Sequence, residues 1–394
     1  MKLKKILIIN TTYREFGGED SNISEEINYL SNDFNVSYLE FKNSEKVTFN
    51  DILSFVFLTN KKSNKMLIER INSFKPDVVY IHNTWFKANL GIFKILEDKK
   101  IPTILKIHNF RYYCSKYFFH RSHLQDNDFC NMCGTKKKKF KIYNKYYENS
   151  FLKSFILYLY SKKLYKLLIK GSFKIAVLTN FHKNFLTNLG IKTDKLIVSR
   201  NPIAINKNTY NPDSSSKYLM YAGRLTKEKG LIQLINVWKK LLKEKKLGNL
   251  TLLIVGDGDL KKYIKSLKNK YQINYIEHTD NENVLNFMKN SLAIITATRM
   301  FEGQPRLLCE ASSLGVPSIY PSFGGIDEFF PKEYTLSFKQ FDYEDLEKKI
   351  MLLGNKELLL NESDRVITHL KSLLTNDENL INQINDYINS VNGK

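Results

Sequence analysis

Residues 292–317 read LAIITATRMFEGQPRLLCEASSLGVP and combine a strand, a turn and a helix in one short segment. The apolar run 292–296 is typical of a buried strand. Pro305 suits the first position of a helix, because the N–H that it lacks is not needed there. Gly315 followed by Pro317 is typical of a helix end. A buried strand that leads into a helix predicts an α/β fold with a parallel sheet.

The same segment carries two glutamates eight positions apart, Glu302 and Glu310. The pattern places Glu302 in the turn before the helix and Glu310 about two turns into it, on nearly the same face. Backbone amides at Arg306 and Leu307, together with the positive end of the helix dipole, suit a phosphate. A carboxylate further along can accept hydrogen bonds from a ribose diol. The segment therefore predicts a sugar-nucleotide site.

Strand and helix patterns alternate along both halves of the chain. Strands are predicted at 5–9, 36–41, 78–81, 103–107 and 174–179, and again at 218–222, 250–255, 274–276, 292–296 and 317–320. Two such series predict two Rossmann-like domains with parallel sheets facing a central cleft, where ligands bind beyond the carboxyl ends of the strands. We place the first domain at 1–200 and the second at 201–375, with a C-terminal helix at 376–394 that packs back on the first.

Composition limits the class of protein. The 394 residues are 43% hydrophobic, which indicates a folded chain, and the net charge is +21. Such a charge favours an anionic partner, although general over-use of lysine is an alternative explanation. No apolar run approaches the length that spans a bilayer, and the apolar N-terminal run stops at Asn10, too early for a signal peptide. We expect a cytoplasmic protein.

Glycines and cations follow several predicted strands. Gly17 and Gly18 follow the first strand, and Gly223, Arg224 and Lys229 follow strand 218–222. The glycine pair lets backbone amides approach a phosphate, or forms only a tight turn. Two fixed cations beside a diphosphate would stabilise a leaving nucleotide.

Two further strand ends carry candidate residues. Gly256 follows strand 250–255 and is typical either of close ligand approach or of an ordinary turn. His108 follows strand 103–107, where it can hydrogen-bond a sugar hydroxyl, the alternative being a structural histidine.

Together these residues resemble a retaining glycosyltransferase of family four, whose fold of two Rossmann-like domains is called GT-B. The matching features, in chain order, are the loop Gly17-Gly18, His108 of the His-Asp motif, Asn201-Pro202 at the start of the second domain, the pair Arg224 and Lys229, and Glu302…Glu310 as the Glu-x7-Glu motif. The resemblance covers essentially the whole chain. The segment from His108 to Cys114 is similar to a subgroup common in bacterial surface-polysaccharide clusters.

The resemblance implies a role for each residue. His108, Arg224, Lys229 and Glu302 would be catalytic. The donor would contact Gly17, Gly18, Gly223, Gly256, Arg306, Leu307 and Glu310. The second domain would bind a UDP- or GDP-sugar and the first domain the acceptor. The sugar would be transferred with retention, with the leaving diphosphate as base and with no metal or cofactor required.

Two departures from the family pattern bear on this reading. Asn109 stands where the family has Asp, so this position has an amide in place of a carboxylate. Gln304-Pro305-Arg306 replaces a common Phe-Gly-Leu, and Pro305 has no amide to donate.

Cys114, Cys130 and Cys133 cluster in the sequence, and the Cys-x-x-Cys pair has zinc-knuckle spacing. His120 or His123 could complete a structural zinc site, with reduced buried thiols or a redox pair as alternatives. Cys309 is expected to be a buried helix residue.

Residues 135–174 contain many lysines interleaved with aromatic and aliphatic residues. This basic arm suits an anionic membrane surface, or it forms a packed helix with a solvated lysine face. No nucleic-acid motif supports RNA binding. A polyprenyl-diphosphate-linked acceptor would explain the charge and a peripheral location on the inner membrane.

We predict a glycosyltransferase of surface-polysaccharide assembly, such as O-antigen, capsule or lipopolysaccharide. The alternatives are a hydrolase or epimerase, a degenerate sugar-nucleotide sensor or scaffold, and a nucleic-acid-binding protein.

Overall fold

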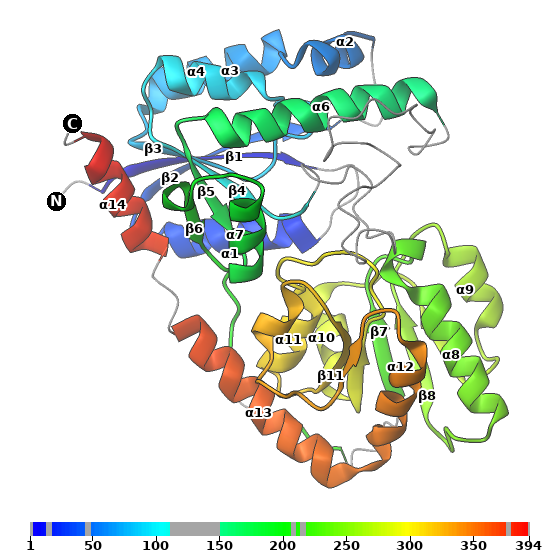
Figure 1. Ribbon diagram of the computed structural model, residues 1–394. Helices are drawn as coiled ribbons and strands as arrows, with labels where there is room; N and C mark the ends of the chain where they lie inside the picture. The colour runs from blue at the N-terminus through cyan, green and yellow to red at the C-terminus, as the bar shows by residue number, and fades with distance from the viewer. Residues whose placement is uncertain are drawn as a thin grey trace. The chain divides into compact units, whose positions relative to one another are not determined.

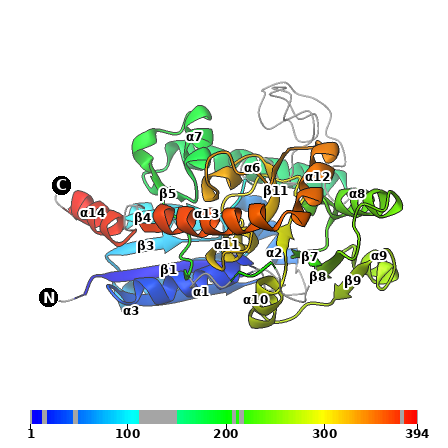
Figure 2. The ribbon, with the colours of Figure 1, turned by 90° about the horizontal axis from the view of Figure 1, so that it is seen from below.

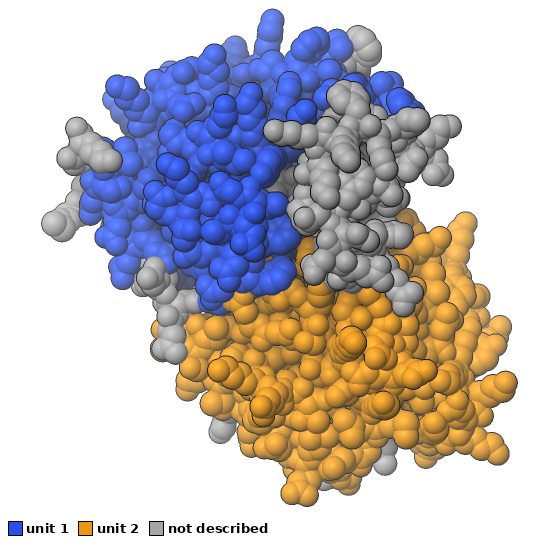
Figure 3. All heavy atoms as spheres, in the orientation of Figure 1, with its two compact units in different colours: residues 1–202, 377–394 blue, residues 203–376 orange. Residues whose placement is uncertain are grey.

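The chain divides into two compact units in the computed structural model. The structure describes residues 3–12, 18–43, 49–110, 150–205, 210–212, 218–375 and 380–392. Unit 1 comprises Met1–Pro202 and Asp377–Lys394, and unit 2 comprises Ile203–Asn376 (Figures 1 and 3). The division follows Pro202, two residues after the predicted boundary between residues 200 and 201.

Unit 1 is built on a sheet of six parallel strands in the order β2-β1-β3-β4-β5-β6. The strands are β1 (Lys5–Thr12), β2 (Asn35–Lys42), β3 (Val78–Ile81), β4 (Thr103–Ile107), β5 (Lys174–Val177) and β6 (Leu196–Val198). The chain goes to one side of β1 for β2 and to the other side for β3. The direction of winding therefore reverses between β1 and β3, which is where α/β sheets bind ligands.

Helices cover both faces of this sheet. Those described in unit 1 are α1 (Gly18–Leu30), α2 (Phe49–Phe57), α3 (Lys61–Phe74), α4 (Gly91–Asp98), α6 (Phe151–Lys170), α7 (Asn180–Asn188) and α14 (Leu380–Asn392). Figure 1 shows α3 and α4 over one face and α1 and α14 over the other. Because both faces are covered, β3 and β4 are buried along their whole length, which explains why they appear in the sequence as continuous apolar runs.

Unit 2 contains a second sheet of six parallel strands, in the order β12-β11-β10-β7-β8-β9. Its strands are β7 (Tyr218–Ala222), β8 (Thr251–Val255), β9 (Ile273–Ile276), β10 (Ala293–Ile295), β11 (Ser318–Ser322) and β12 (Ser337–Lys339). Its α-helices are α8 (Leu231–Lys243), α9 (Lys261–Leu267), α10 (Asn281–Lys289), α11 (Arg306–Ser313), α12 (Tyr343–Met351) and α13 (Lys356–Thr375). Figures 1 and 2 show α13 beside α11, and the two helices are in contact. Here the winding reverses between β7 and β10.

The two parallel sheets confirm the predicted fold class. The segment that indicated it contains β10 and α11, as expected. The helix differs from the prediction by one position at its start: Pro305 has ψ 94°, which is not helical, so it is the N-cap and Arg306 is the first helical residue. The Pro305 carbonyl accepts hydrogen bonds from the amides of Leu308 and Cys309, both at 3.0 Å.

Helix α14 completes the core of unit 1, although it follows unit 2 in the chain. Leu380, Ile384 and Ile388 are buried against one face of the sheet and against α1. Their partners include Ile6 and Ile8 of β1. The spacing of four residues places all three on one side of the helix, so α14 buries a continuous apolar stripe.

We expect Ile384→Ala to destabilise unit 1 by about 2–4 kcal/mol, because it removes a fully buried side chain and leaves a cavity. Unfolding in urea, followed by the fluorescence of Trp85 in a Trp238→Phe background, would report on unit 1 because each unit contains one tryptophan. Val391→Ala removes an exposed side chain from the same helix and is the matched control. Equal midpoints for the two variants would contradict the assignment of α14 to the core.

Candidate functional site

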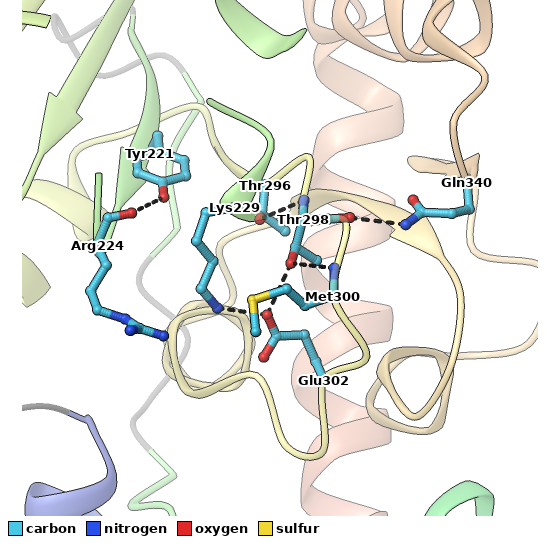
Figure 4. A network of polar contacts seen from close by, with 8 residues as sticks. All are labelled: Tyr221, Arg224, Lys229, Thr296, Thr298, Met300, Glu302 and Gln340. Carbon is cyan, nitrogen blue, oxygen red and sulfur yellow. Dashed lines mark hydrogen bonds and ion pairs between the residues drawn. The ribbon is translucent and has the colours of Figure 1, made fainter. Parts of the chain in front are cut away.

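Polar and charged side chains of unit 2 gather where the winding of its sheet reverses. Strand β7 leads directly into Gly223 and Arg224, and β10 leads through a loop to Glu302. Parallel strands carry their carboxyl ends to the same edge of the sheet, so these loops meet there. Figure 4 shows the side chains that they bring together.

Close backbone packing joins the loops after β7 and β8. Gly256 has φ +145°, and a Cβ built on it would lie 2.0 Å from the carbonyl oxygen of Gly223. The amide of Leu225 donates to the carbonyl of Asp257 at 2.8 Å. Only glycine allows this approach, so Gly223 and Gly256 have a structural reason to be glycine whether or not a ligand is bound.

Lys229 and Glu302 form an ion pair at the same edge. Lys229 Nζ lies 2.6 Å from Glu302 Oε1, and the two side chains are 22% and 19% exposed. The pairing depends on Gly230, which follows Lys229 with φ +72° and at which a Cβ would lie 1.8 Å from the Ala297 carbonyl oxygen. The chain after β7 is therefore held against the loop after β10, and this brings Lys229 to Glu302.

The loop after β10 is held by its own threonines. Thr298 is buried, and its hydroxyl donates to Glu302 Oε1 at 3.0 Å (Figure 4). The same hydroxyl oxygen accepts from the Met300 amide at 3.3 Å. The carbonyl of Thr298 accepts from Gln340 Nε2 at 3.0 Å. These bonds fix the Glu302 carboxylate before any ligand binds. The sequence analysis did not identify Thr298 or Gln340.

Arg224 differs from Lys229 in its surroundings. Its side chain is exposed, and among the residues that the structure describes no carboxylate lies within ion-pair distance of it. Figure 4 shows the Arg224 side chain extending from the end of β7 in the same direction as Lys229. The backbone is fixed, since the Tyr221 hydroxyl donates to the Arg224 carbonyl at 2.8 Å. An anion at this edge would meet the exposed Arg224 and the cation that Lys229 shares with Glu302.

Helix α11 carries the second glutamate. Glu310 Oε1 accepts from Arg306 Nε at 2.7 Å, one turn apart on the same face. The helix begins at Arg306, so the amides of Arg306 and Leu307 have no carbonyl partner within the helix itself. Cys309 is a buried residue of this helix, as predicted. Each glutamate of the Glu-x7-Glu pattern is thus already paired with a cation of its own unit.

In unit 1 the equivalent edge carries histidines. His82 directly follows β3 and His108 directly follows β4. His82 Nδ1 lies 3.0 Å from His108 Nε2, and the rings are stacked with centroids 5.2 Å apart. Behind His82 lies a buried pair, in which Lys106 Nζ donates to Glu26 at 2.8 and 2.9 Å. Sequence reasoning found His108 and missed Glu26, His82 and Lys106, although a lysine inside the apolar run of β4 was a visible signal.

These histidines are held in the neutral form. Burial lowers the pKa of His82 and His108 well below its usual value, and the charge of Lys106 lowers both further. Burial lowers the pKa of His182 to about 3. Lys106 is also affected: burial lowers its pKa, and the Glu26 carboxylate opposes that change.

Some predicted residues cannot be placed. Gly17 and the cysteines at 114, 130 and 133 lie outside the described residues, so the zinc site stays a prediction. Gly18 is the first residue of α1. Within the described ranges, no group of three or more His, Cys, Asp or Glu could hold a metal ion. The helices described there include none that is both long enough and apolar enough to cross a bilayer.

Unit 2 contains the residues that match a known protein family. Residues 203–371 match the family model described as glycosyl transferases group 1. Unit 2 carries a group 1 glycosyltransferase domain. Arg224, Lys229, Glu302 and Glu310 all lie within the matched residues of this domain.

Curated relatives match part of the chain. An uncharacterized glycosyltransferase of Haemophilus influenzae is 29% identical over 199 residues, which are 49% of this chain and 55% of that protein. The amylovoran biosynthesis glycosyltransferase AmsD of Erwinia amylovora is 27% identical over 153 residues, which are 37% of this chain and 42% of that protein. The chain thus spans about half the length of the curated relatives that it matches.

Solved glycosyltransferases share the fold along the whole chain. WaaG, a glycosyltransferase involved in lipopolysaccharide biosynthesis, is 12% identical with a TM-score of 0.60, covering 99% of this chain and 100% of that one. A glycosyltransferase from Rickettsia africae is 16% identical with a TM-score of 0.63, covering 99% of each chain. Anabaena HepE, solved with UDP and glucose, is 13% identical with a TM-score of 0.61, covering 98% and 100%. At these identities the likeness establishes the GT-B fold.

We expect Gly256→Ala to destabilise unit 2 by roughly 3 kcal/mol, because the new methyl group would strike the Gly223 carbonyl and the positive φ is strained for alanine. The fluorescence of Trp238 in a Trp85→Phe background would follow unit 2 during urea unfolding. Gly354→Ala is the matched control, since a Cβ there meets nothing within 4 Å. Similar unfolding midpoints for both variants would refute the close approach of the two loops.

Proposed function

We propose that this protein is a glycosyltransferase that moves a sugar from a nucleotide-diphosphate donor, with retention and without a metal. The observation that carries the proposal is the cluster of Arg224, Lys229 and Glu302 at the switch point of a group 1 glycosyltransferase domain. The histidine pair of unit 1 lies beyond the carboxyl ends of β3 and β4, next to the switch point of the other sheet. Relatives whose names link them to amylovoran and lipopolysaccharide biosynthesis support a role in surface-polysaccharide assembly.

The charges of unit 2 suit a diphosphate leaving group. Arg224 is exposed, and Lys229 can exchange its contact with Glu302 for one with a phosphate oxygen. The amides at the start of α11 and the dipole of that helix add positive potential. Developing negative charge on the leaving nucleotide would thus be stabilised by groups that are already in place. Glu310 would accept hydrogen bonds from the ribose hydroxyls.

The released Glu302 carboxylate would then face the transferred sugar. Thr298 keeps it in position after Lys229 turns to the phosphate. In this scheme the leaving diphosphate takes the proton from the acceptor hydroxyl as the new glycosidic bond forms on the same face of the sugar. No protein nucleophile is needed, and the sugar keeps its anomeric configuration.

The test is a thermal-shift panel with UDP, GDP, ADP and CMP and their sugar conjugates. A ligand at one hundred times its dissociation constant stabilises the folded protein by about 2.7 kcal/mol. We expect a shift with one nucleoside diphosphate, and its loss in Glu310→Ala and in the double variant Arg224→Met/Lys229→Met. Lys240→Met, which breaks the exposed Lys240–Glu347 pair of the same unit, should bind like the parent protein.

The same nucleotide sugar is then offered with bacterial membrane lipids as acceptor, and the anomeric configuration of the product is read by NMR. Retention supports the proposal, whereas inversion contradicts the mechanism. Nucleotide binding without transfer to any acceptor would favour the alternative of a sugar-nucleotide sensor or scaffold. No nucleotide shift at all would overturn the donor site.

A lipid-linked acceptor is supported by the surface of unit 1. Large apolar side chains are exposed on α2 and at the start of α6, among them Phe57 at 69% and Leu152 at 67%. The two helices are in contact, with the rings of Phe55 and Tyr160 stacked 4.8 Å apart. Helix α6 adds exposed lysines at 162, 163, 166 and 170. We propose that this face, the α2–α6 surface, docks on an anionic membrane where a polyprenyl-diphosphate-linked glycan is the acceptor.

We expect the protein to sediment with vesicles that contain phosphatidylglycerol, and less so as salt rises, because screening weakens the lysine contacts. Phe57→Ser/Leu152→Ser should weaken binding by about tenfold or more, since each buried apolar side chain contributes roughly 1.5–3 kcal/mol. Leu360→Ser, at a 47% exposed position of α13 in unit 2, is the control. Absence of sedimentation with anionic vesicles, at any salt concentration, would contradict membrane docking.

A further inference from the structure

A buried charged network lies directly behind His108. Glu26 of α1 is fully buried, and its carboxylate accepts hydrogen bonds from Lys106 Nζ at 2.8 and 2.9 Å and from the Tyr80 hydroxyl at 3.0 Å. His82 Nε2 lies 3.9 Å from Glu26 Oε2. On its other side, His82 Nδ1 meets His108 Nε2 at 3.0 Å. The network thus runs from the helix through β3 and β4 to the candidate catalytic histidine.

A buried charged pair is an unusual element in the core of an α/β domain. Apolar residues of similar volume often stabilise a fold as well as a buried ion pair does. The stability of the fold therefore does not explain why Tyr80, Lys106 and Glu26 are present at these positions. Both charged groups lie against the carboxyl ends of the central strands, next to the two histidines rather than elsewhere in the core.

The geometry restricts where the ring hydrogens can lie. His82 and His108 are neutral, so each imidazole carries one N–H. Between the two facing nitrogens, one must donate and the other accept. A hydrogen on His82 Nε2 points toward the Glu26 carboxylate and is attracted to it, whereas a lone pair there would face the same negative charge. His82 Nδ1 is then the acceptor, and His108 Nε2 donates to it.

We infer that Glu26, Lys106 and His82 are positioning residues that fix the tautomer and the orientation of His108. The remaining nitrogen of His108, Nδ1, then carries a lone pair and acts as an acceptor for a substrate hydroxyl. Lys106 Nζ donates two hydrogen bonds to the buried Glu26 side chain, and the Tyr80 hydroxyl donates a third, so both hold its orientation. This inference rests on the proposed function only for the identity of the substrate.

Among the residues that the structure describes, the groups that face the two histidines come from four elements. They are Glu26 of α1, Tyr80 of β3, Lys106 of β4 and His182 of α7. Burial, His82, Lys106 and His182 all lower the pKa of His108, and Glu26 raises it. His108 should therefore remain neutral, with an unchanged tautomer, in the folded protein. This holds at every pH above the histidine pKa of the unfolded chain.

The first test reads the tautomer directly in the full-length wild-type protein labelled with ¹⁵N-histidine. Long-range ¹H–¹⁵N correlation spectra distinguish protonated from unprotonated ring nitrogens, and loss of a signal set in His108→Gln identifies His108. We expect a protonated Nε2 and an unprotonated Nδ1, unchanged between pH 6.5 and 8. A protonated Nδ1, or a mixture of the two tautomers, would overturn the inference whatever the protein's activity.

The second test removes the charges together. Glu26→Gln/Lys106→Met leaves no unpaired buried charge, so it should fold, and circular dichroism checks this. We expect the His108 signals to become a mixture of tautomers and kcat for sugar transfer to fall by on the order of 100-fold. KM for the donor nucleotide should change little, because unit 2 binds it. Asp77→Asn, a carboxylate of unit 1 that bonds the Lys5 amide away from the network, is the control.

The two tests separate failure of this inference from failure of the proposed function. A wild-type protein with the expected tautomer but no transferase activity would leave the positioning role intact and overturn the function. A double variant that folds, keeps a single tautomer and keeps its kcat would overturn the positioning role and leave the function intact.

Discussion

In both sheets the first strand lies inside the sheet, and the chain leaves it in opposite directions for its neighbours. This constraint opens a space beyond the carboxyl ends of β1 and β3 in unit 1, and of β7 and β10 in unit 2, where no crossover helix fills the edge. Polar side chains can gather there without being buried in the core. The Lys229–Glu302 pair of unit 2 lies at such a place, and the histidine pair of unit 1 lies next to one, beyond β3 and β4.

Both edges are ordered without a ligand, but by different means. In unit 2 the backbone does most of the ordering, since Gly230 and Gly256 allow neighbouring loops to approach more closely than any other residue would. In unit 1 the ordering comes from side chains, in a network that ends in the buried Glu26–Lys106 pair. A prepared site loses less free energy to reorganisation when charge develops during a reaction.

The sequence predicted the architecture well, because apolar runs and their spacing report directly on burial. The strands that it missed, β6 and β12, have three residues each and lie at the edges of the two sheets, outside the long apolar runs of the central strands. It placed Glu302 in the turn before α11 and Lys229 in the loop after β7, and the structure has both residues there. That the two pair with each other depends on the contact of Gly230 with Ala297, which is distant in sequence. Similarly, Lys106 was visible as a polar residue in an apolar strand, but its partner Glu26 lies 80 positions away.

The position of α14 affects how the protein can be made. Its buried stripe covers the same face of the sheet as α1, yet it is synthesised about 180 residues after β6. During translation, the part of that face that includes Ile6 and Ile8 therefore stays exposed to solvent until residues 380–392 leave the ribosome. Unit 2 is continuous in the chain and can fold in the meantime. Unit 1 is therefore synthesised first but completes its fold last, so its exposed apolar face is available to chaperones for the longest time.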